Sequence, residues 1–166
     1  MENKAVVFID CEVKKENQKI TDFGAVNEAG EQFHSTNLLS FTRFLQGNNY
    51  ICGHNIVHHD LKYLEKNVDL SDYIPIDTLY LSPLLFPEKP YHKLLKDDKL
   101  QTEELNNPLN YAIKAKDLFF DEVNAFQGLP NYLKRIFCAL LFDFPEFRGF
   151  FQYDGFRPYS LSELLY

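Results

Sequence analysis

The stretch Val6-Val7-Phe8-Ile9-Asp10-Cys11-Glu12-Val13 is an apolar strand that ends in two carboxylates with one residue between them. Side chains alternate along a strand with a period of two, so Asp10 and Glu12 point to the same side. Two like charges this close repel each other unless a cation lies between them. Hard carboxylate oxygens favour Mg²⁺ or Mn²⁺ over zinc. The alternative is a strand that ends in solvent, with exposed acids at its frayed end.

The rest of the pattern predicts an α/β protein. After the first strand, over residues 4–13, we expect two further antiparallel strands and then alternating helices and strands. The expected strands cover residues 20–27, 32–35, 50–53 and 74–76, and the expected helices cover residues 38–45, 60–67, 78–86, 108–126, 132–142 and 145–151. This order predicts a mixed sheet that is covered by helices.

A second acidic segment runs from Gly53 to Asp60, where a strand ends, a polar loop follows and Asp60 opens a helix. The carboxyl ends of neighbouring parallel strands lie at the same edge of a sheet, which is where α/β proteins usually bind ligands. We therefore expect Asp10, Glu12 and Asp60 to converge. Taken alone, Asp60 is better explained as a favourable charge at a helix N-terminus, whereas together with Asp10 and Glu12 it favours a metal site.

Three segments, Phe8–Glu12, Phe23–Val26 and Gly53-His54-Asn55 through Asp60, resemble the DnaQ-like (DEDD) 3′–5′ exonucleases, a family with a ribonuclease H-like fold. The resemblance covers residues 4–126, although Asp60 lies one residue further from His54 than is common. A narrower resemblance, over residues 77–87 and 92–97, is to exonuclease domains that precede a RecQ-type DNA helicase.

The resemblance implies a five-stranded mixed sheet, two metal ions and release of nucleoside monophosphates from 3′ ends. In it, Asp10 bridges the ions, Glu12 holds the first and Asp60 holds the second. His54 and Asn55 contact the substrate, and His92 is the candidate general base. The expected cofactor is Mg²⁺ or Mn²⁺, two ions in a fully active site.

The fourth acid of the family is missing. Where the family has a carboxylate on its last helix and a histidine five residues earlier, this chain has Tyr111 and Asn106. A neutral phenol is a poor ligand at pH 7. His92 and Asp97 reproduce the spacing, but well before the helix. The sequence therefore predicts either an exonuclease with altered metal use or a module that binds nucleic acid or protein without turnover.

The expected partner is a single-stranded 3′ end, DNA rather than RNA, and the parent protein is expected to contain a helicase domain. Lys93 and Lys96 are candidates for phosphate contacts, although a solvated lysine stripe explains them equally well. We expect an exonuclease-like domain over residues 1–128 and a helical extension over residues 129–166. The extension is rich in Phe and Tyr, which predicts an aromatic surface that packs on a partner or on more of the same polypeptide.

Composition limits the class of protein. The chain has 166 residues and a net charge of −7, which argues against broad binding to duplex nucleic acid. Its three cysteines are far apart and form no metal-binding motif. We expect reduced, buried thiols in a cytoplasmic protein without a membrane span.

Overall fold

The computed structural model describes residues 4–92, 107–157 and 160–164. Its strands are β1 (Val6–Lys14), β2 (Lys19–Asn27), β3 (Gln32–Ser35), β4 (Tyr50–Gly53) and β5 (Ile74–Asp77). Its helices are α1 (Leu38–Leu45), α2 (Asp60–Leu64), α3 (Thr78–Leu85), α4 (Pro108–Gln127), α5 (Asn131–Leu141), α6 (Pro145–Tyr153) and α7 (Leu161–Leu164). The expected strands and helices are all present, and their bounds agree within a few residues. The largest difference in bounds is α2, which ends at Leu64 instead of continuing to Asn67. The short helix α7 was not expected from the sequence.

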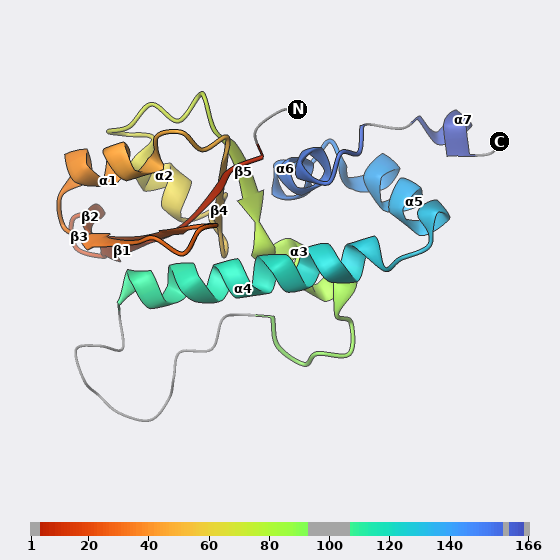
Figure 1. The fold of residues 1–166 in the computed structure, drawn as a ribbon, viewed down its shortest axis with the longest axis horizontal. Coiled ribbons are helices and arrows are strands. Elements are labelled where there is room, and N and C mark those ends of the chain that lie inside the picture. Colours follow the sequence, from red (N-terminus) through yellow and green to blue (C-terminus); the bar gives the residue numbers. More distant parts are fainter. Residues whose placement is uncertain (1–3, 93–106, 158–159, 165–166) are drawn as a thin grey trace.

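The five strands form one sheet in the order β3-β2-β1-β4-β5. Strand β2 is antiparallel to both β1 and β3, whereas β4 and β5 are parallel to β1. This mixed sheet with helices on both faces confirms the predicted α/β class and is consistent with a ribonuclease H-like fold (Figure 1).

Strand β1 is central because both of its faces are apolar. Val6 and Phe8 belong to the core between the sheet and α4. Val7, Ile9 and Cys11 face the opposite core, which α1 and α2 cover (Figure 1). The alternation places Asp10 and Glu12 on the α4 face, just beyond the buried part of the strand.

Helix α4 begins directly against β2. Asn107 caps it, its side chain accepting a hydrogen bond from the Leu109 N–H at 2.9 Å, and Pro108 occupies the first helical turn. A Cβ atom on Gly24 of β2 would lie 2.1 Å from the backbone nitrogen of Leu109. Only glycine allows this approach, and Gly24 pairs with Asp10 on β1. The first turn of α4 therefore lies beside the end of the candidate acidic site.

The aromatic residues of the C-terminal extension pack mainly inside the molecule, so the prediction of a largely exposed aromatic surface was wrong. Phe150 and Phe151 are fully buried in the same core as Phe119 and Phe126 of α4. Phe126 contacts Phe150 edge-to-face, with ring centroids 5.3 Å apart. The large apolar side chains of the described extension that do remain exposed are Tyr132, Leu140 and Phe144.

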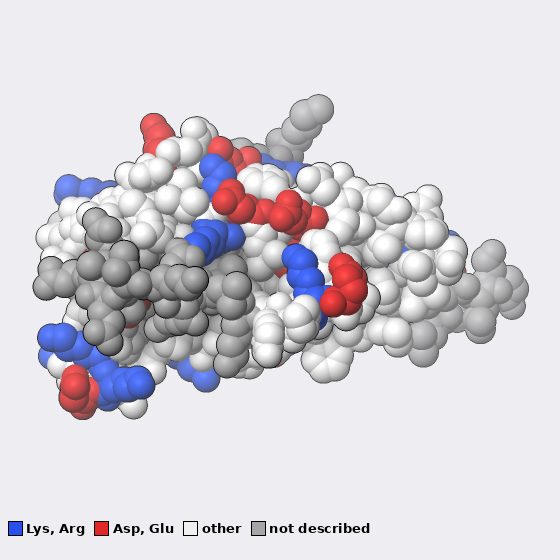
Figure 2. Space-filling model, turned by 90° about the horizontal axis from the view of Figure 1, so that it is seen from below, with Lys and Arg blue, Asp and Glu red and all other residues white. Residues whose placement is uncertain are grey.

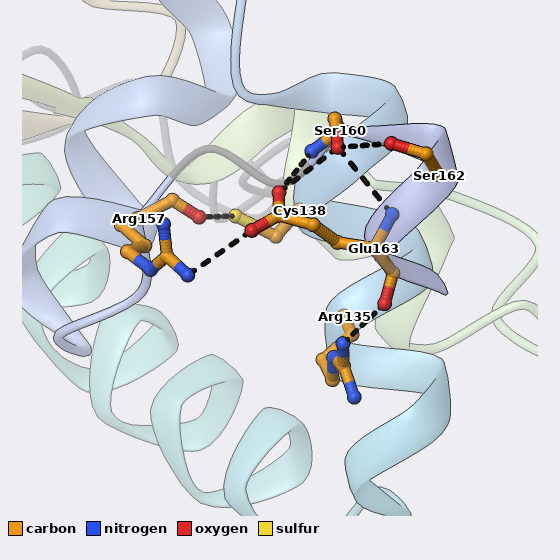
Figure 3. Close-up of polar contacts among 6 residues, drawn as sticks. All are labelled: Arg135, Cys138, Arg157, Ser160, Ser162 and Glu163. Atoms are coloured by element: carbon orange, nitrogen blue, oxygen red, sulfur yellow. Dashed lines mark hydrogen bonds and ion pairs between the residues drawn. The ribbon is translucent and has the colours of Figure 1, made fainter. Parts of the chain in front are cut away.

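Polar contacts attach α7 to α5 (Figure 3). Arg135 donates to the backbone carbonyl of Glu163 at 2.6 Å, and the Glu163 carboxylate accepts hydrogen bonds from Ser160 and pairs with Arg157. The buried Cys138 thiol donates to the Arg157 carbonyl at 3.1 Å. The last described turn of the chain thus folds back on the extension.

The three cysteines are free and buried, as expected, and lie in separate parts of the fold (Cys11, Cys52 and Cys138). Among the described residues, no helix has both the length and the apolar character needed to cross a membrane.

Candidate functional site

Asp60 reaches the end of β1 from the first turn of α2. The residue is 1% exposed, and its Oδ1 atom accepts a hydrogen bond from the backbone N–H of Cys11 at 2.8 Å. Parallel pairing of β1 with β4 ends at Phe8, which leaves the edge of β1 beyond Phe8 without a strand partner on that side. The Asp60 carboxylate thus gives the Cys11 N–H a hydrogen-bond partner, without which this buried backbone group would be unsatisfied.

The three predicted acids lie around the same point. Cys11 stands between Asp10 and Glu12 in the sequence, and Asp60 binds its backbone. Burial raises the pKa of the Cys11 thiol well above its usual value, and the fields of the three carboxylates raise it further. Asp60 also raises the pKa of the neighbouring His59, with a smaller contribution from Glu12. The start of α2, which carries Asp60, therefore meets the part of β1 that carries Asp10 and Glu12.

The sequence pattern did not indicate a further acid, Asp22, beside Glu12. The two residues are direct partners across β1 and β2, so their side chains share the α4 face. His34 of β3 lies on the same face, with its Nε2 atom 2.7 Å from Oδ2 of Asp22. A β-bulge follows Glu12, a feature often found beside active sites. The pairing register of the β1–β2 hairpin is the signal that could have predicted this cluster. The bulge after Glu12 shifts that register, so counting back from the turn does not pair Glu12 with Asp22.

The donor set suits a hard divalent cation, because it is made of carboxylates at the end of a central strand. Asp60 has one oxygen on the Cys11 backbone, and its Oδ2 atom lies 3.6 Å from Nδ1 of His59. In the described part of the chain, no three His, Cys, Asp or Glu side chains are arranged as an ion-holding group. The carboxylate oxygens nevertheless fit a hard cation by their chemistry, and Asp10, Glu12 and Asp60 are the residues that would hold it.

Tyr111 lies in the first turns of α4, the helix that begins beside Gly24 and hence beside the Asp10 row of the sheet. Its side chain is half-buried, and the Lys114 ammonium lies 5.8 Å from its ring centroid. The helix expected to supply the fourth acid thus reaches the site with a phenol at that position. Asn106 lies outside the described residues, as does Asp97.

The loop that carries His54 and Asn55 is held by one buried side chain, Asp77. Its carboxylate accepts hydrogen bonds from the backbone N–H groups of Asn55, Val57 and Leu79, at 2.9 to 3.1 Å. Burial raises the pKa of Asp77, and the three N–H donors counteract that rise. Asn55 has a φ of 65°, a left-handed conformation that is uncommon outside glycine and often marks functional loops.

His54 and His92 both contact α3. His54 lies beside Thr78, the first residue of the helix, and His92 lies beside Ser82. His54 Nδ1 is 2.9 Å from the Thr78 hydroxyl, and burial lowers the pKa of His54 to about 4, so its ring is neutral at pH 7. His92 Nδ1 is 2.8 Å from the Ser82 hydroxyl. The structure thus ties His54 to the start of α3 and His92 to Ser82 of the same helix, while the role of His92 as general base remains a prediction. Lys93 and Lys96 lie outside the described residues.

The surface that contains α4 carries charges of both signs. Figure 2 shows red and blue side chains intermixed there, without a continuous basic stripe among the described residues. Lys116 is engaged in structure, because its Nζ atom donates to the carbonyls of Asn27 and Glu28. The described part of this face therefore offers no broad electrostatic track for a duplex.

Comparison with models of known protein families, with curated proteins and with solved structures finds no match.

Proposed function

We propose that the chain is a metal-dependent 3′–5′ exonuclease domain that releases nucleoside monophosphates from single-stranded 3′ ends, DNA rather than RNA. The observation that supports it is the meeting of Asp10, Glu12 and Asp60 around the Cys11 backbone, at the end of the central strand. The sheet order, in which β1 lies between an antiparallel and a parallel partner, agrees with this function.

The protein's own contribution is to fix the positions of the carboxylates. The Oδ1 atom of Asp60 accepts a hydrogen bond from the Cys11 N–H, which anchors the side chain. The Oδ2 atom is the oxygen that would bind a metal ion. Asp10 and Glu12 share the α4 face of β1, and Asp22 stands opposite Glu12. Mg²⁺ or Mn²⁺ bound by these groups would activate a water molecule and stabilise the leaving 3′ oxygen. We further propose that the domain serves a DNA repair helicase in its parent protein.

A second candidate function is binding of nucleic acid or protein without turnover. Tyr111 favours it, because this residue occupies the position of the fourth acid on the helix that reaches the site. The two candidates differ in one measurable property, the shortening of an oligonucleotide.

The test is incubation of the chain in excess with a 5′-labelled single-stranded oligonucleotide and either Mg²⁺ or Mn²⁺. We expect stepwise shortening from the 3′ end, which Asp10→Asn reduces by at least about a hundredfold. Tyr111→Asp is expected to increase shortening and to bind Mn²⁺ about tenfold more tightly, because it adds a charged ligand.

Tyr111→Phe is the matched control for the last variant and should leave metal affinity unchanged. Bound but intact oligonucleotide with both metals would support the binding module instead. Shortening that survives Asp10→Asn would assign the activity to a contaminant and contradict the proposal.

A further inference from the structure

The loop between β4 and α2 is attached to the C-terminal extension as well as to the sheet. His58 of this loop lies with its Nε2 atom 2.6 Å from Oε1 of Glu146, in the first turn of α6. The two residues are 88 positions apart in the sequence, and Glu146 lies outside residues 4–126, which the exonuclease resemblance covers.

Aromatic rings surround this contact on the side of α3. The His58 ring lies edge-on to Tyr80, with centroids 5.6 Å apart, and Tyr80 lies edge-on to Phe147 of α6, at 6.4 Å. The contact with Tyr80 restricts the His58 imidazole in addition to its contact with Glu146. The pair therefore has a defined geometry, unlike an ion pair between two flexible surface side chains.

Helix α6 itself is held firmly against the sheet. A Cβ atom on Gly149 would lie 1.9 Å from the carbonyl oxygen of Pro75 in β5, so helix and strand are in backbone contact there. Phe150 and Phe151 of the same helix are fully buried. Glu146 is thus presented to the loop from a rigid support.

Five polar contacts attach the 54–60 loop to other described parts of the chain. His54 contacts the Thr78 hydroxyl, the N–H groups of Asn55 and Val57 bind Asp77, and Asp60 binds the Cys11 N–H. The fifth contact, His58 with Glu146, is the only one of these that the extension supplies. It lies between Val57 and Asp60, where the loop approaches the acidic site.

We propose that Glu146 is a positioning residue that holds the 54–60 loop through His58 and thereby sets the place of Asp60 at the end of β1. For its effect on cleavage, the inference rests on the exonuclease function proposed above. The attachment itself does not depend on that function, because it concerns only the geometry of the loop.

Hydrogen exchange measured by mass spectrometry on the full chain tests the attachment. We expect Glu146→Ala to speed exchange of the loop amides, including those of Val57 and His59, by about tenfold, with the rest of the sheet unchanged. Glu146→Gln keeps an acceptor oxygen and should retain most of the protection. Asp143→Asn removes an exposed charge just before α6 and serves as the matched control.

The cleavage assay tests the consequence. At saturating oligonucleotide, Glu146→Ala should lower the rate about tenfold without lowering the unfolding midpoint, as expected for loss of a supporting contact. In a His58→Ala background, the same substitution should have no further effect. If the parent chain does not cleave, the proposed function fails, and hydrogen exchange alone decides the attachment.

Loop exchange in Glu146→Ala equal to that in Asp143→Asn would overturn the inference. So would faster exchange throughout the sheet, because Glu146 would then stabilise the whole fold instead of the loop. A normal cleavage rate despite a loosened loop would refute the positioning role while leaving the contact in place.

Discussion

Glu122 is an acidic residue in an apolar, fully buried environment. It lies on the face of α4 that contains Phe119, Val123 and Phe126, and it is 0% exposed. Neither of its carboxylate oxygens has a hydrogen-bond partner among the described residues. Burial raises the pKa of Glu122 well above its usual value, and nearby Asp77 raises it further, whereas Lys89 lowers it. The folded state therefore favours the neutral carboxyl group.

This environment predicts that stability falls as the pH rises. Because the folded protein binds the Glu122 proton more tightly than the unfolded chain, stabilisation is complete below the unfolded pKa. It is lost above that pH, by up to about 1.4 kcal/mol per pH unit, until the folded pKa is reached. Urea unfolding from pH 4 to pH 8 should show Glu122→Gln gaining stability relative to the parent as the pH rises. Asp117→Asn, an exposed residue of the same helix whose charge is not among the causes of the Glu122 shift, should run parallel to the parent. A Glu122→Gln curve that also does so would contradict the prediction.

At this scale the sequence predicts some site residues and not others. Asp10 and Glu12 share a face because of strand periodicity alone, which needs no knowledge of neighbours. Asp22 and His34 join them only through the β1–β2–β3 register, and the bulge after Glu12 shifts that register. The spacing of Glu122 from Phe119 and Phe126 is compatible with a buried face. A carboxylate is almost never fully buried without a partner, so its charge indicates that Glu122 should be exposed to solvent.

Among the elements, α4 connects the fold to the candidate site. Its N-terminus reaches the sheet at Gly24, where a side chain would meet the backbone of Pro108 and Leu109 at 2.1 to 2.5 Å. A backbone obstacle cannot move aside as a flexible side chain does. The helix therefore has to shift if any atom is added at this position.

Gly24→Ala should accordingly destabilise the protein by about 3 kcal/mol, at the upper end for an overpacked core. Chemical unfolding followed by circular dichroism gives the measurement. Gly128→Ala is the matched control, because a Cβ atom there has only ordinary contacts at 3.5 Å, and its effect should be below about 1 kcal/mol. Similar stabilities for the two variants would mean that α4 does not approach β2 as closely as described.

The order and type of these elements could be predicted because each carries a local signal. Pro108 opens α4, Asp77 caps α3, and alternation marks β1. How closely α4 approaches Gly24 could not be predicted, since it depends on two segments that are more than 80 residues apart and on the absence of a single atom.

For the whole molecule, the extension contributes to the same core as the sheet. Phe150 and Phe151 pack with Phe126 of α4, and Gly149 contacts the β5 backbone. From sequence, the aromatic residues after Leu129 exceed what short helices bury alone, which predicted a partner. The partner for most of them is the chain's own α4 and sheet, a long-range contact that composition does not reveal.

This shared core predicts that the extension and the sheet unfold together. Phe150→Ala removes a fully buried ring and should lower the free energy of unfolding by about 4 kcal/mol in a single transition. Phe144→Ala, in which the same residue type is 54% exposed, should cost less than about 1 kcal/mol. Guanidinium unfolding followed by near- and far-ultraviolet circular dichroism distinguishes the two variants. Two separate transitions in Phe150→Ala would contradict the prediction. They would mean that residues 129–166 unfold independently of the sheet, whereas parts that share one core unfold in a single transition.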